Sequence, residues 1–366
     1  MKRILLAFLL ILLPISPAQS STLITLTAPT NKLADGRFVN NDLALSISPG
    51  GDLGKALEIT ASSNRTWLID PALIEEIVDL VDFRYISDAL TPTEALAILN
   101  KAKANRAKNE VNLIKDGLPA YTTTPGWLGY SDEKMVTLAK QAVADGFTLI
   151  KLKCGGSKED DRRRLKLARD AIGPDIRLAI DANQVWDVPE AIEWINSLGD
   201  VNLHWVEEPT NPDDVVGHAA IAKAIAPVRV ATGEHVANRI IFKQMLQSKS
   251  LSFVQIDASR VAGINENIAI ILMAAKFGIP VCPHAGGVGL CEMVQHLAMF
   301  DYVAVSGEHP DRVVEFVDHL HEHFVVPTDI RRARYMPPSK AGAGAEMFAQ
   351  SVSDFTFPTG KQWLNN

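Results

Sequence analysis

The 366-residue sequence predicts an α/β fold, and three observations support this prediction. From about residue 117 onward, short apolar or β-branched runs alternate with amphipathic segments at a period of roughly 25 residues, which is typical of parallel β/α units. Eight such runs can be distinguished. No phosphate-binding GxGxxG or GxxxxGK motif opens a helix after an early strand, as it does in many open doubly wound sheets. A closed TIM-like barrel of the (β/α)7β type is therefore favoured.

The expected strands are the eight apolar runs, in chain order Ala120–Thr123, Thr148–Lys153, Arg177–Asp181, Leu203–Glu207, Val228–Thr232, Phe253–Asp257, Ile279–Pro283 and Tyr302–Ser306. Segments between them place apolar residues on one helical face, which predicts helices at Asp132–Asp145, Glu159–Ile172, Pro189–Leu198, Arg239–Ser248 and Asn265–Phe277. Four glycines stand where such helices usually end: Gly146, Gly173, Gly199 and Gly278.

Residues 1–20 have the composition of a secretory signal. Lys2-Arg3 precedes an unbroken apolar run, Ile4–Leu13, and the small residues Ala18 and Ser20 follow at the spacing of a signal-peptidase site. The run is too short to cross a bilayer, so no membrane span is expected. This leader predicts a secretory or extracytoplasmic location; the alternative is a cytoplasmic protein with a mis-assigned start.

Three further regions follow this leader. Residues 21–115 combine irregular β structure with helical stretches and lead into the barrel. Residues 116–326 are expected to form the barrel itself. Residues 327–366 are rich in loops, with Pro337-Pro338 and two nearby glycines, and are expected to pack back toward the N-terminal region.

The composition excludes several classes of protein. Apolar residues make up 47% of the chain and charged residues 22%, which argues against disorder and against a membrane bundle. The net charge of −7, without any Lys/Arg-rich block, argues against nucleic-acid binding. Cys154, Cys282 and Cys291 are too few for a disulfide framework, so buried free thiols are expected.

Six consecutive predicted strands end in an ionisable residue, at the end that faces the active site in such barrels. Asp181, Glu207 and Glu234 close the third, fourth and fifth strands. Three carboxylates that converge repel one another unless a cation lies between them, and ligands that are all oxygen select a hard ion. These residues are therefore predicted to bind Mg²⁺. The alternative for each is a surface charge or a helix N-cap.

Lys151 and Lys153 lie two apart on the second strand, so both side chains point to one face. In a barrel this face is the interior, where a lysine is costly unless it has a role. Mutual repulsion and a nearby cation are expected to lower the pKa of one lysine, making it a usable base near neutral pH. Lysines that extend to solvent or protect a sheet edge are the alternative.

Asp257 and His284 end the sixth and seventh strands. A carboxylate that accepts a hydrogen bond from one imidazole nitrogen fixes the orientation of the ring, so this pair is predicted to act as a second acid or base. It would face the lysines across the pocket. His319, His321 and His323 are close in sequence, but their alternate spacing indicates metal only weakly, and a solvated or packing role is expected.

Taken together, these residues resemble the mandelate-racemase-like branch of the enolase superfamily. The KxK, DxN, EEP and GE motifs, followed by the sixth-strand Asp and the seventh-strand His, are similar to the series of that branch. Four longer strings resemble L-fuconate dehydratases and their animal relatives: Val81–Asp88, Thr124–Tyr130, Cys282–Glu292 and Glu315–Phe324. The similarity runs from about residue 67 to residue 340.

The resemblance implies a role for each candidate residue. The three carboxylates would hold Mg²⁺, which binds the substrate carboxylate and stabilises the enediolate. Lys153 would remove the proton at C2, with Lys151 beside it. His284, oriented by Asp257, would protonate the departing C3 hydroxyl. The enol that remains would become a 2-keto-3-deoxy sugar acid.

The resemblance also implies a substrate class. Asn183 and Glu315 match positions that line the family's pocket, and the implied activity is that of a hydro-lyase, the Mg²⁺-dependent dehydration of an L-fuconate-type acid sugar. A racemase, an epimerase or another acid-sugar dehydratase uses the same groups, so these alternatives stay open. The implied partner is a small sugar acid, and assembly into a homo-oligomer stays open.

The N-terminal region departs from the family pattern. Family members carry a capping domain, a small antiparallel sheet followed by helices, which closes the barrel mouth. Here Ala28–Gly36 resembles the sheet loosely, and the helical part is missing between about Thr60 and Trp67. Residues 21–115 are therefore interpreted as a reduced α+β capping region. Because a water-poor site depends on such a lid, a non-catalytic barrel that retains the metal site is an alternative of another class.

Overall fold

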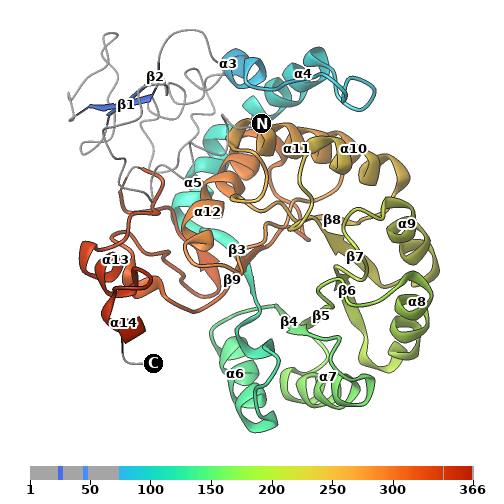
Figure 1. Cartoon of the computed structure of the whole chain (residues 1–366). Helices are drawn as coiled ribbons and strands as arrows, with labels where there is room; N and C mark the ends of the chain where they lie inside the picture. The colour runs from blue at the N-terminus through green and yellow to red at the C-terminus, as the bar shows by residue number, and fades with distance from the viewer. Residues whose placement is uncertain (1–23, 28–43, 48–73, 341, 365–366) are drawn as a thin grey trace.

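The structure is a computed structural model that describes residues 24–27, 44–47, 74–340 and 342–364. Parallel strands form a ring, and helices surround it (Figure 1). The signal-like segment 1–20 and the expected gap in the cap near residues 60–67 lie outside the described residues. In the N-terminal region, β1 (Ile24–Thr27) and β2 (Ala44–Ile47) pair as antiparallel strands.

The barrel strands pair in parallel and in chain order. They are β3 Leu118–Thr122, β4 Leu149–Lys153, β5 Arg177–Asp181, β6 Leu203–Glu207, β7 Arg229–Thr232, β8 Phe253–Val254 and β9 Val314–Phe316. Residues 280–284 continue the ladder between β8 and β9. The Cys282 N–H donates to Val254 O at 2.8 Å, and the Glu315 N–H donates to Pro283 O at 3.1 Å. Since β9 also pairs with β3, the ring closes, and the predicted α/β barrel is confirmed.

The helices that cover the barrel are α6 Asp132–Ala144, α7 Lys158–Ile172, α8 Val188–Ser197, α9 Val215–Ala224, α10 Arg239–Ser248, α11 Ile264–Phe277 and α12 Leu290–Phe300. Five of them begin at a residue whose side chain accepts a backbone hydrogen bond of the first turn: Ser131, Ser157, Asp187, Asp214 and Asn238. The five predicted helices are all found, with ends that differ by at most one residue.

Among the described residues, three helices precede the barrel: α3 Ile74–Asp79, α4 Pro92–Lys103 and α5 Arg106–Asp116. The loop between α3 and α4 is tied to α10, because Asp88 Oδ1 lies 3.1 Å from Lys243 Nζ. At the other end of the chain, β10 Arg334–Tyr335 pairs antiparallel to β3, and α13 Ala349–Phe355 and α14 Lys361–Leu364 follow. The domain boundaries stay predictions. No helix in the described part of the chain is both long and apolar enough to cross a bilayer.

The eighth predicted strand, Tyr302–Ser306, is wrong. These residues belong to a π-helical turn, Asp301–Ser306, that continues directly from α12. Their β-branched side chains favoured a strand, but no glycine or proline separates them from the preceding helix. The turn packs against α4, α5 and α12 and ends at Gly307, where φ is 64°. The closing strand is β9 instead.

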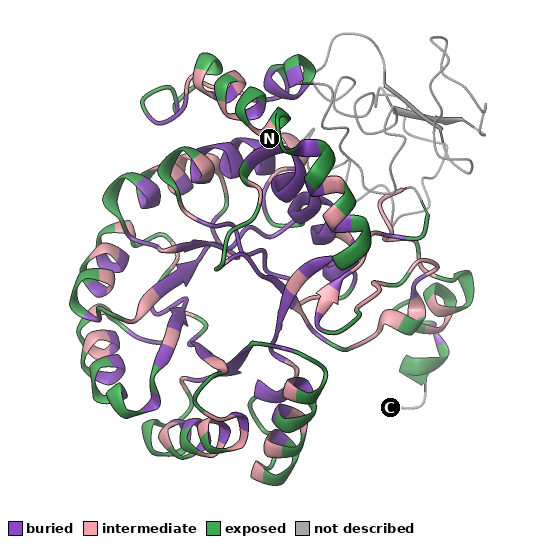
Figure 2. Ribbon diagram, turned by 180° about the vertical axis from the view of Figure 1, so that it is seen from behind, coloured by how far each residue is buried: buried purple, intermediate pink, exposed green. Residues whose placement is uncertain are grey.

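One layer of apolar side chains fills the barrel interior, with one residue from each member of the ring: Tyr121, Leu149, Ala179, Trp205, Ala231, Phe253, Cys282 and Val313. The Trp205 ring packs against Tyr121 edge to face, with centroids 5.2 Å apart, and against Phe253 at 4.9 Å. Buried residues also cover the inner faces of the helices, and exposed residues lie outside (Figure 2). We call the interior layer the apolar floor, because the functional residues stand above it.

Candidate active site

The candidate site is the layer of side chains directly above the apolar floor. Residues two apart on a strand point to the same face, so the residue two positions after each floor residue also faces the interior. These residues are Thr123, Lys151, Asp181, Glu207, Gly233, Gln255, His284 and Glu315. Except for Gly233, each has a polar side chain. The interior therefore changes from apolar to polar, mostly ionisable, side chains in one step, at the carboxyl ends of the strands, where barrel enzymes place their chemistry.

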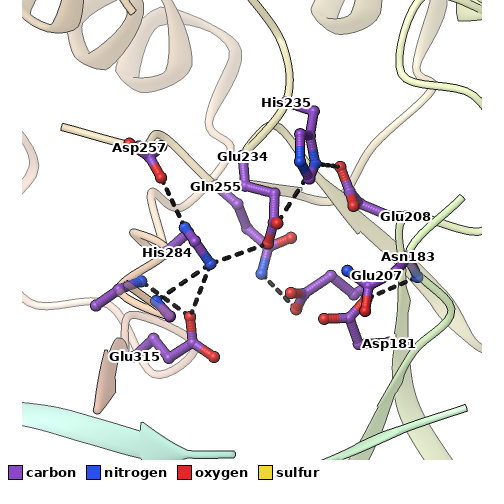
Figure 3. Close-up of polar contacts among 12 residues, drawn as sticks. Asp181, Asn183, Glu207, Glu208, Glu234, His235, Gln255, Asp257, His284 and Glu315 are labelled. Carbon is purple, nitrogen blue, oxygen red and sulfur yellow. Dashed lines mark hydrogen bonds and ion pairs between the residues drawn. The ribbon is translucent and has the colours of Figure 1, made fainter. Parts of the chain in front are cut away.

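Asp181, Glu207 and Glu234 are brought together as predicted (Figure 3). One oxygen of each carboxylate lies within 4.8 Å of the corresponding oxygens of the other two. All three side chains are buried. They come from β5, from β6 and from the loop directly after β7, which are neighbours in the ring. This geometry allows one cation to contact all three.

The chemistry of this cluster fits a divalent cation that prefers oxygen. Glu234 Oε2 is buried and accepts no hydrogen bond, although His284 Nε2 lies 3.2 Å from it. Burial raises the pKa of Glu207 well above its ordinary value, which reflects the cost of a further negative charge among carboxylates. A divalent ion would offset that cost. Three oxygen ligands without sulfur favour Mg²⁺ over softer metals.

Lys151 and Lys153 both point into the barrel from β4. Lys151 is fully buried, with Nζ 3.3 Å from Asp181 Oδ2 and 3.0 Å from Glu315 Oε1, and it also contacts Glu207. Lys153 Nζ lies 2.5 Å from Asp181 Oδ2, and 13% of its side chain is exposed. Lys151 is therefore enclosed by carboxylates, whereas Lys153 reaches solvent.

The expected lowering of a lysine pKa is not found at Lys151. Burial by itself lowers the pKa of this amine, but the Glu207 and Glu315 carboxylates outweigh burial and raise the pKa well above its ordinary value. The prediction considered the neighbouring lysine and a cation, but not the carboxylates that the closed barrel brings around Lys151. This amine stays protonated near neutral pH, so Lys153 is the candidate base.

His284 and Asp257 form the predicted pair. His284 Nδ1 lies 2.8 Å from Asp257 Oδ2, and Asp257 Oδ1 accepts three hydrogen bonds from residues 259–260. Burial lowers the pKa of His284, but the Asp257 hydrogen bond and the Glu315 and Glu234 carboxylates raise it overall. His284 Nε2 faces Glu234 and Glu315 (Figure 3). The imidazole therefore approaches the carboxylate cluster from the side opposite the lysines.

The two residues predicted to bind substrate have different surroundings. Glu315 is buried, where its Oε1 accepts a hydrogen bond from Thr123 Oγ1 at 2.5 Å and its Oε2 accepts one from the Ala285 N–H at 2.9 Å. Burial raises the pKa of Glu315, but Lys151 and His284 lower it to about 2, so the side chain is ionised.

Asn183 is exposed, and its backbone N–H donates to Asp181 Oδ1 at 3.0 Å. Its φ of 44° lies in the left-handed region, which asparagine tolerates better than most residues. The backbone of Asn183 thus helps to orient one of the clustered carboxylates. The roles of Asn183 and Glu315 toward a substrate stay predictions.

Four polar residues beside the cluster were not predicted. Gln255 Nε2 donates to Glu207 Oε2 at 2.6 Å, and Arg260 Nη1 lies 3.2 Å from Glu234 Oε1. His235 Nδ1 lies 2.7 Å from Glu208 Oε1 and 3.4 Å from Glu234 Oε1. Gln255 could have been predicted, because it lies two residues before Asp257 and side chains two apart on a strand point to the same face.

The other three could not be found in this way. Glu208 directly follows Glu207 in the sequence, where the strand period predicts an outward side chain. Instead, Glu208 has a φ of 43°, so the backbone turns at the end of β6 and the side chain swings toward His235. His235 lies beyond the end of β7, in a loop to which the strand period does not apply. Arg260 lies in a loop, where no sequence pattern predicts the direction of a side chain.

The histidines at 319, 321 and 323 have packing contacts, as expected. His321 Nδ1 lies 2.6 Å from Glu292 Oε1, and its ring stacks on Phe316 with centroids 5.4 Å apart. His323 Nδ1 lies 3.0 Å from Ser351 Oγ. The three cysteines are buried and free, also as expected.

The chain is similar to curated proteins of one family. A family model described as "Enolase C-terminal domain-like" matches residues 134–351. Mitochondrial enolase superfamily member 1 from Homo sapiens is 52% identical over 297 residues, which cover 81% of this chain and 66% of that protein. L-galactonate dehydratase from Hypocrea jecorina is 48% identical over 289 residues, which cover 78% and 64%. The chain thus spans just under two thirds of the length of these relatives.

Two solved structures share the architecture. The crystal structure of human mitochondrial enolase superfamily member 1 matches with a TM-score of 0.79 and 47% identity, covering 86% of this chain and 74% of that chain. L-talarate dehydratase from Polaromonas sp. JS666, complexed with Mg and L-glucarate, matches with a TM-score of 0.59 and 26% identity, covering 87% and 88%. The family model covers more than half of the present sequence. With its barrel and its cluster of carboxylates at the strand ends, this chain belongs to the enolase superfamily.

Proposed function

We propose that this protein is a Mg²⁺-dependent dehydratase of acid sugars and that L-fuconate is its substrate. One observation carries the proposal, an amine and an imidazole on opposite sides of one carboxylate cluster. Lys153 contacts the cluster through Asp181, at 2.5 Å. His284 contacts it through Glu234, at 3.2 Å. Dehydration beside a carboxylate needs a base at C2 and an acid at C3, which this arrangement supplies.

In this mechanism Lys153 takes the proton from C2 of the substrate. The Lys153 side chain is partly exposed, whereas the buried Lys151 keeps its proton and contributes a fixed positive charge. When bound, Mg²⁺ supplies positive charge that stabilises the negative charge developing on the substrate carboxylate as the C2 proton leaves.

His284 acts as the acid. Asp257 holds Nδ1, and Nε2 lies 3.1 Å from the Gly286 nitrogen and 3.2 Å from Glu234 Oε2. In the reaction this Nε2 gives a proton to the C3 hydroxyl. The C3–O bond breaks, water leaves, and the electron pair from the broken C2–H bond forms the C2–C3 double bond. The resulting enol tautomerises to a 2-keto-3-deoxy sugar acid.

The names of the relatives support the substrate class. One is an L-galactonate dehydratase, and a solved relative is an L-talarate dehydratase that holds Mg and L-glucarate. L-fuconate is L-galactonate without the C6 hydroxyl, so the two acids share every atom at which the reaction takes place. We choose L-fuconate over L-galactonate because of the strings that resemble L-fuconate dehydratases, such as Cys282–Glu292.

The test is an incubation with Mg²⁺ and a panel of acid sugars that includes L-fuconate and L-galactonate, followed by a 2-keto acid assay. We expect product from L-fuconate with a higher kcat/KM than from L-galactonate, and none from Lys153→Ala or His284→Ala. No product from L-fuconate, with product from another acid sugar, would exclude the specific substrate.

Two further outcomes separate the alternatives. Inversion at C2 without loss of water would identify a racemase or epimerase, which uses the same two groups. Binding of Mg²⁺ without exchange of the C2 proton in D₂O would identify a non-catalytic barrel that retains the metal site.

A further inference from the structure

The turn after β3 packs directly onto the strand that carries the two lysines. A Cβ built on Gly126 would lie 2.6 Å from Leu152 Cα and would also overlap Lys151 O. Only glycine allows this approach of two backbones. The next residue, Trp127, places its ring 5.7 Å from Lys153 Nζ. The turn thus contacts β4 between the lysines and extends to the amine of Lys153.

One buried arginine joins this turn to the end of β4. Arg164, on α7, donates from Nη1 to Lys153 O at 2.8 Å. Its Nη2 donates to Gly126 O and Trp127 O, both at 3.1 Å. Only 3% of Arg164 is exposed. The planar guanidinium presents several donors in a fixed arrangement, so a single side chain holds three carbonyl oxygens at once.

A second buried charge on α7 acts on the same segment. Asp161, one turn before Arg164, is 1% exposed, and its Oδ2 accepts a hydrogen bond from the Gly155 N–H at 2.7 Å. The chain just after Lys153 is therefore held from α7 at two points. Burying a charged group is costly unless it forms hydrogen bonds. Asp161 and Arg164 form theirs with the backbone around the proposed base.

Arg169 on the same helix provides a contrast. It also donates to backbone carbonyls, at Ile176 (2.6 Å), Gly173 (2.8 Å) and Val201 (3.0 Å). These carbonyls lie before β5 and β6, at the end of the barrel away from the candidate site. Arg164 and Arg169 thus make similar bonds to the backbone, and only Arg164 makes them next to Lys153.

We propose that Arg164 is a positioning residue for Lys153. By fixing the Lys153 carbonyl against the Trp127 turn, it holds the Lys153 amine 2.5 Å from Asp181 Oδ2 and beside the indole ring. The kinetic part of this inference rests on the proposed function, in which Lys153 is the base. A displacement of about 1 Å in a catalytic group costs on the order of 100-fold in rate, so the effect is expected in kcat more than in KM.

The experiment compares Arg164→Lys and Arg164→Met with Arg169→Lys and Arg169→Met in the full chain. Acylation of the Lys153 amine by acetic anhydride is followed by peptide mass spectrometry, with the exposed Lys158 as an internal reference. We expect Lys153 to react several-fold faster in the Arg164 variants, because its amine moves away from Asp181 toward solvent. We expect the rate in the Arg169 variants to stay at the parental value.

Kinetics and folding complete the comparison. With L-fuconate, kcat should fall about tenfold or more in Arg164→Lys, with KM within about twofold of the parent, whereas Arg169→Lys keeps both values. Circular dichroism identifies the variants that fold. If the two methionine variants do not fold, the comparison uses Arg164→Lys and Arg169→Lys alone. Equal acylation of Lys153 in the Arg164 and Arg169 variants overturns the proposal. If the parent forms no product and exchanges no C2 proton, the proposed function fails, while acylation still decides the role of Arg164.

Discussion

Replacing Gly126 with alanine is expected to disable the proposed chemistry without removing any ionisable group. The new Cβ would overlap Lys151 O and would lie 2.6 Å from Leu152 Cα and 3.0 Å from Lys151 C. All three are backbone atoms of β4, so no side-chain rotation relieves the overlap. The turn and the strand must move apart, and both lysines move with the strand.

The size of this movement follows from the distances. To lengthen the 2.6 Å approach to Leu152 Cα to 3.4 Å, where ordinary van der Waals contact begins, the two backbones must separate by at least 0.8 Å, and the overlap with Lys151 O requires more. A misplacement of about 1 Å costs on the order of 100-fold in rate, which corresponds to about 2.7 kcal/mol of transition-state stabilisation. Overpacking of this kind also lowers the free energy of unfolding by about 1–3 kcal/mol.

The assay is exchange of the substrate C2 proton in D₂O, measured by NMR, together with thermal denaturation. Gly156→Ala is the matched control, because Gly156 lies in the loop just after β4 and a Cβ there meets no atom within 4 Å. We expect parental exchange and stability in the control. A folded Gly126→Ala protein that exchanges the proton at the parental rate would show that the lysines do not depend on this turn.

Three further predictions concern the metal, the acid and pH. Glu234→Gln should weaken Mg²⁺ binding at least about 100-fold in a calorimetric titration, since even outer-shell changes cost about 10–100-fold; unchanged affinity would remove this carboxylate from the metal site. Asp257→Asn removes the partner that lies 2.8 Å from His284, so dehydration should fall about tenfold or more while C2 exchange persists; equal losses of both would contradict a separate acid. Burial lowers the pKa of His321, but the Glu292 hydrogen bond outweighs burial and raises it, so this pair stabilises the fold fully below about pH 6.5 and progressively less as pH rises through the folded-state pKa. The loss of thermal stability in His321→Asn should therefore be larger at about pH 6 than at about pH 9, and an equal loss at both would refute the assignment.

Most of the barrel could be predicted because its signals are local. A strand such as Arg177–Asp181 is a short apolar run, and a helix such as Arg239–Ser248 has one apolar face and a side-chain cap at Asn238. The failure at Tyr302–Ser306 has the opposite cause. That segment has strand-like residues, but it continues a buried helix, and packing against α4 and α5 outweighs its β-propensity.

The charged members of the site could also be anticipated, because a parallel barrel brings all strand ends to one face. Once the strands that end in Asp181 and Glu207 are placed correctly, the proximity of these two residues follows, because they pair across β5 and β6. The electrostatics could not be anticipated. Lys151 stays protonated because of Glu207 and because of Glu315, which lies on the closing barrel strand β9, 164 positions away in the chain.

By itself the sequence determined the alternation of strands and helices, the polarity of each strand end and the identity of the groups that converge there, because these depend on period and on chain order. Only the tertiary structure decided which strand closes the ring, which lysine is enclosed by carboxylates and which arginine on α7 reaches the backbone of Lys153. Those outcomes depend on distances between residues far apart in the chain. The physical reason is that burial and Coulomb interactions are set by neighbours in space, which a linear pattern does not specify.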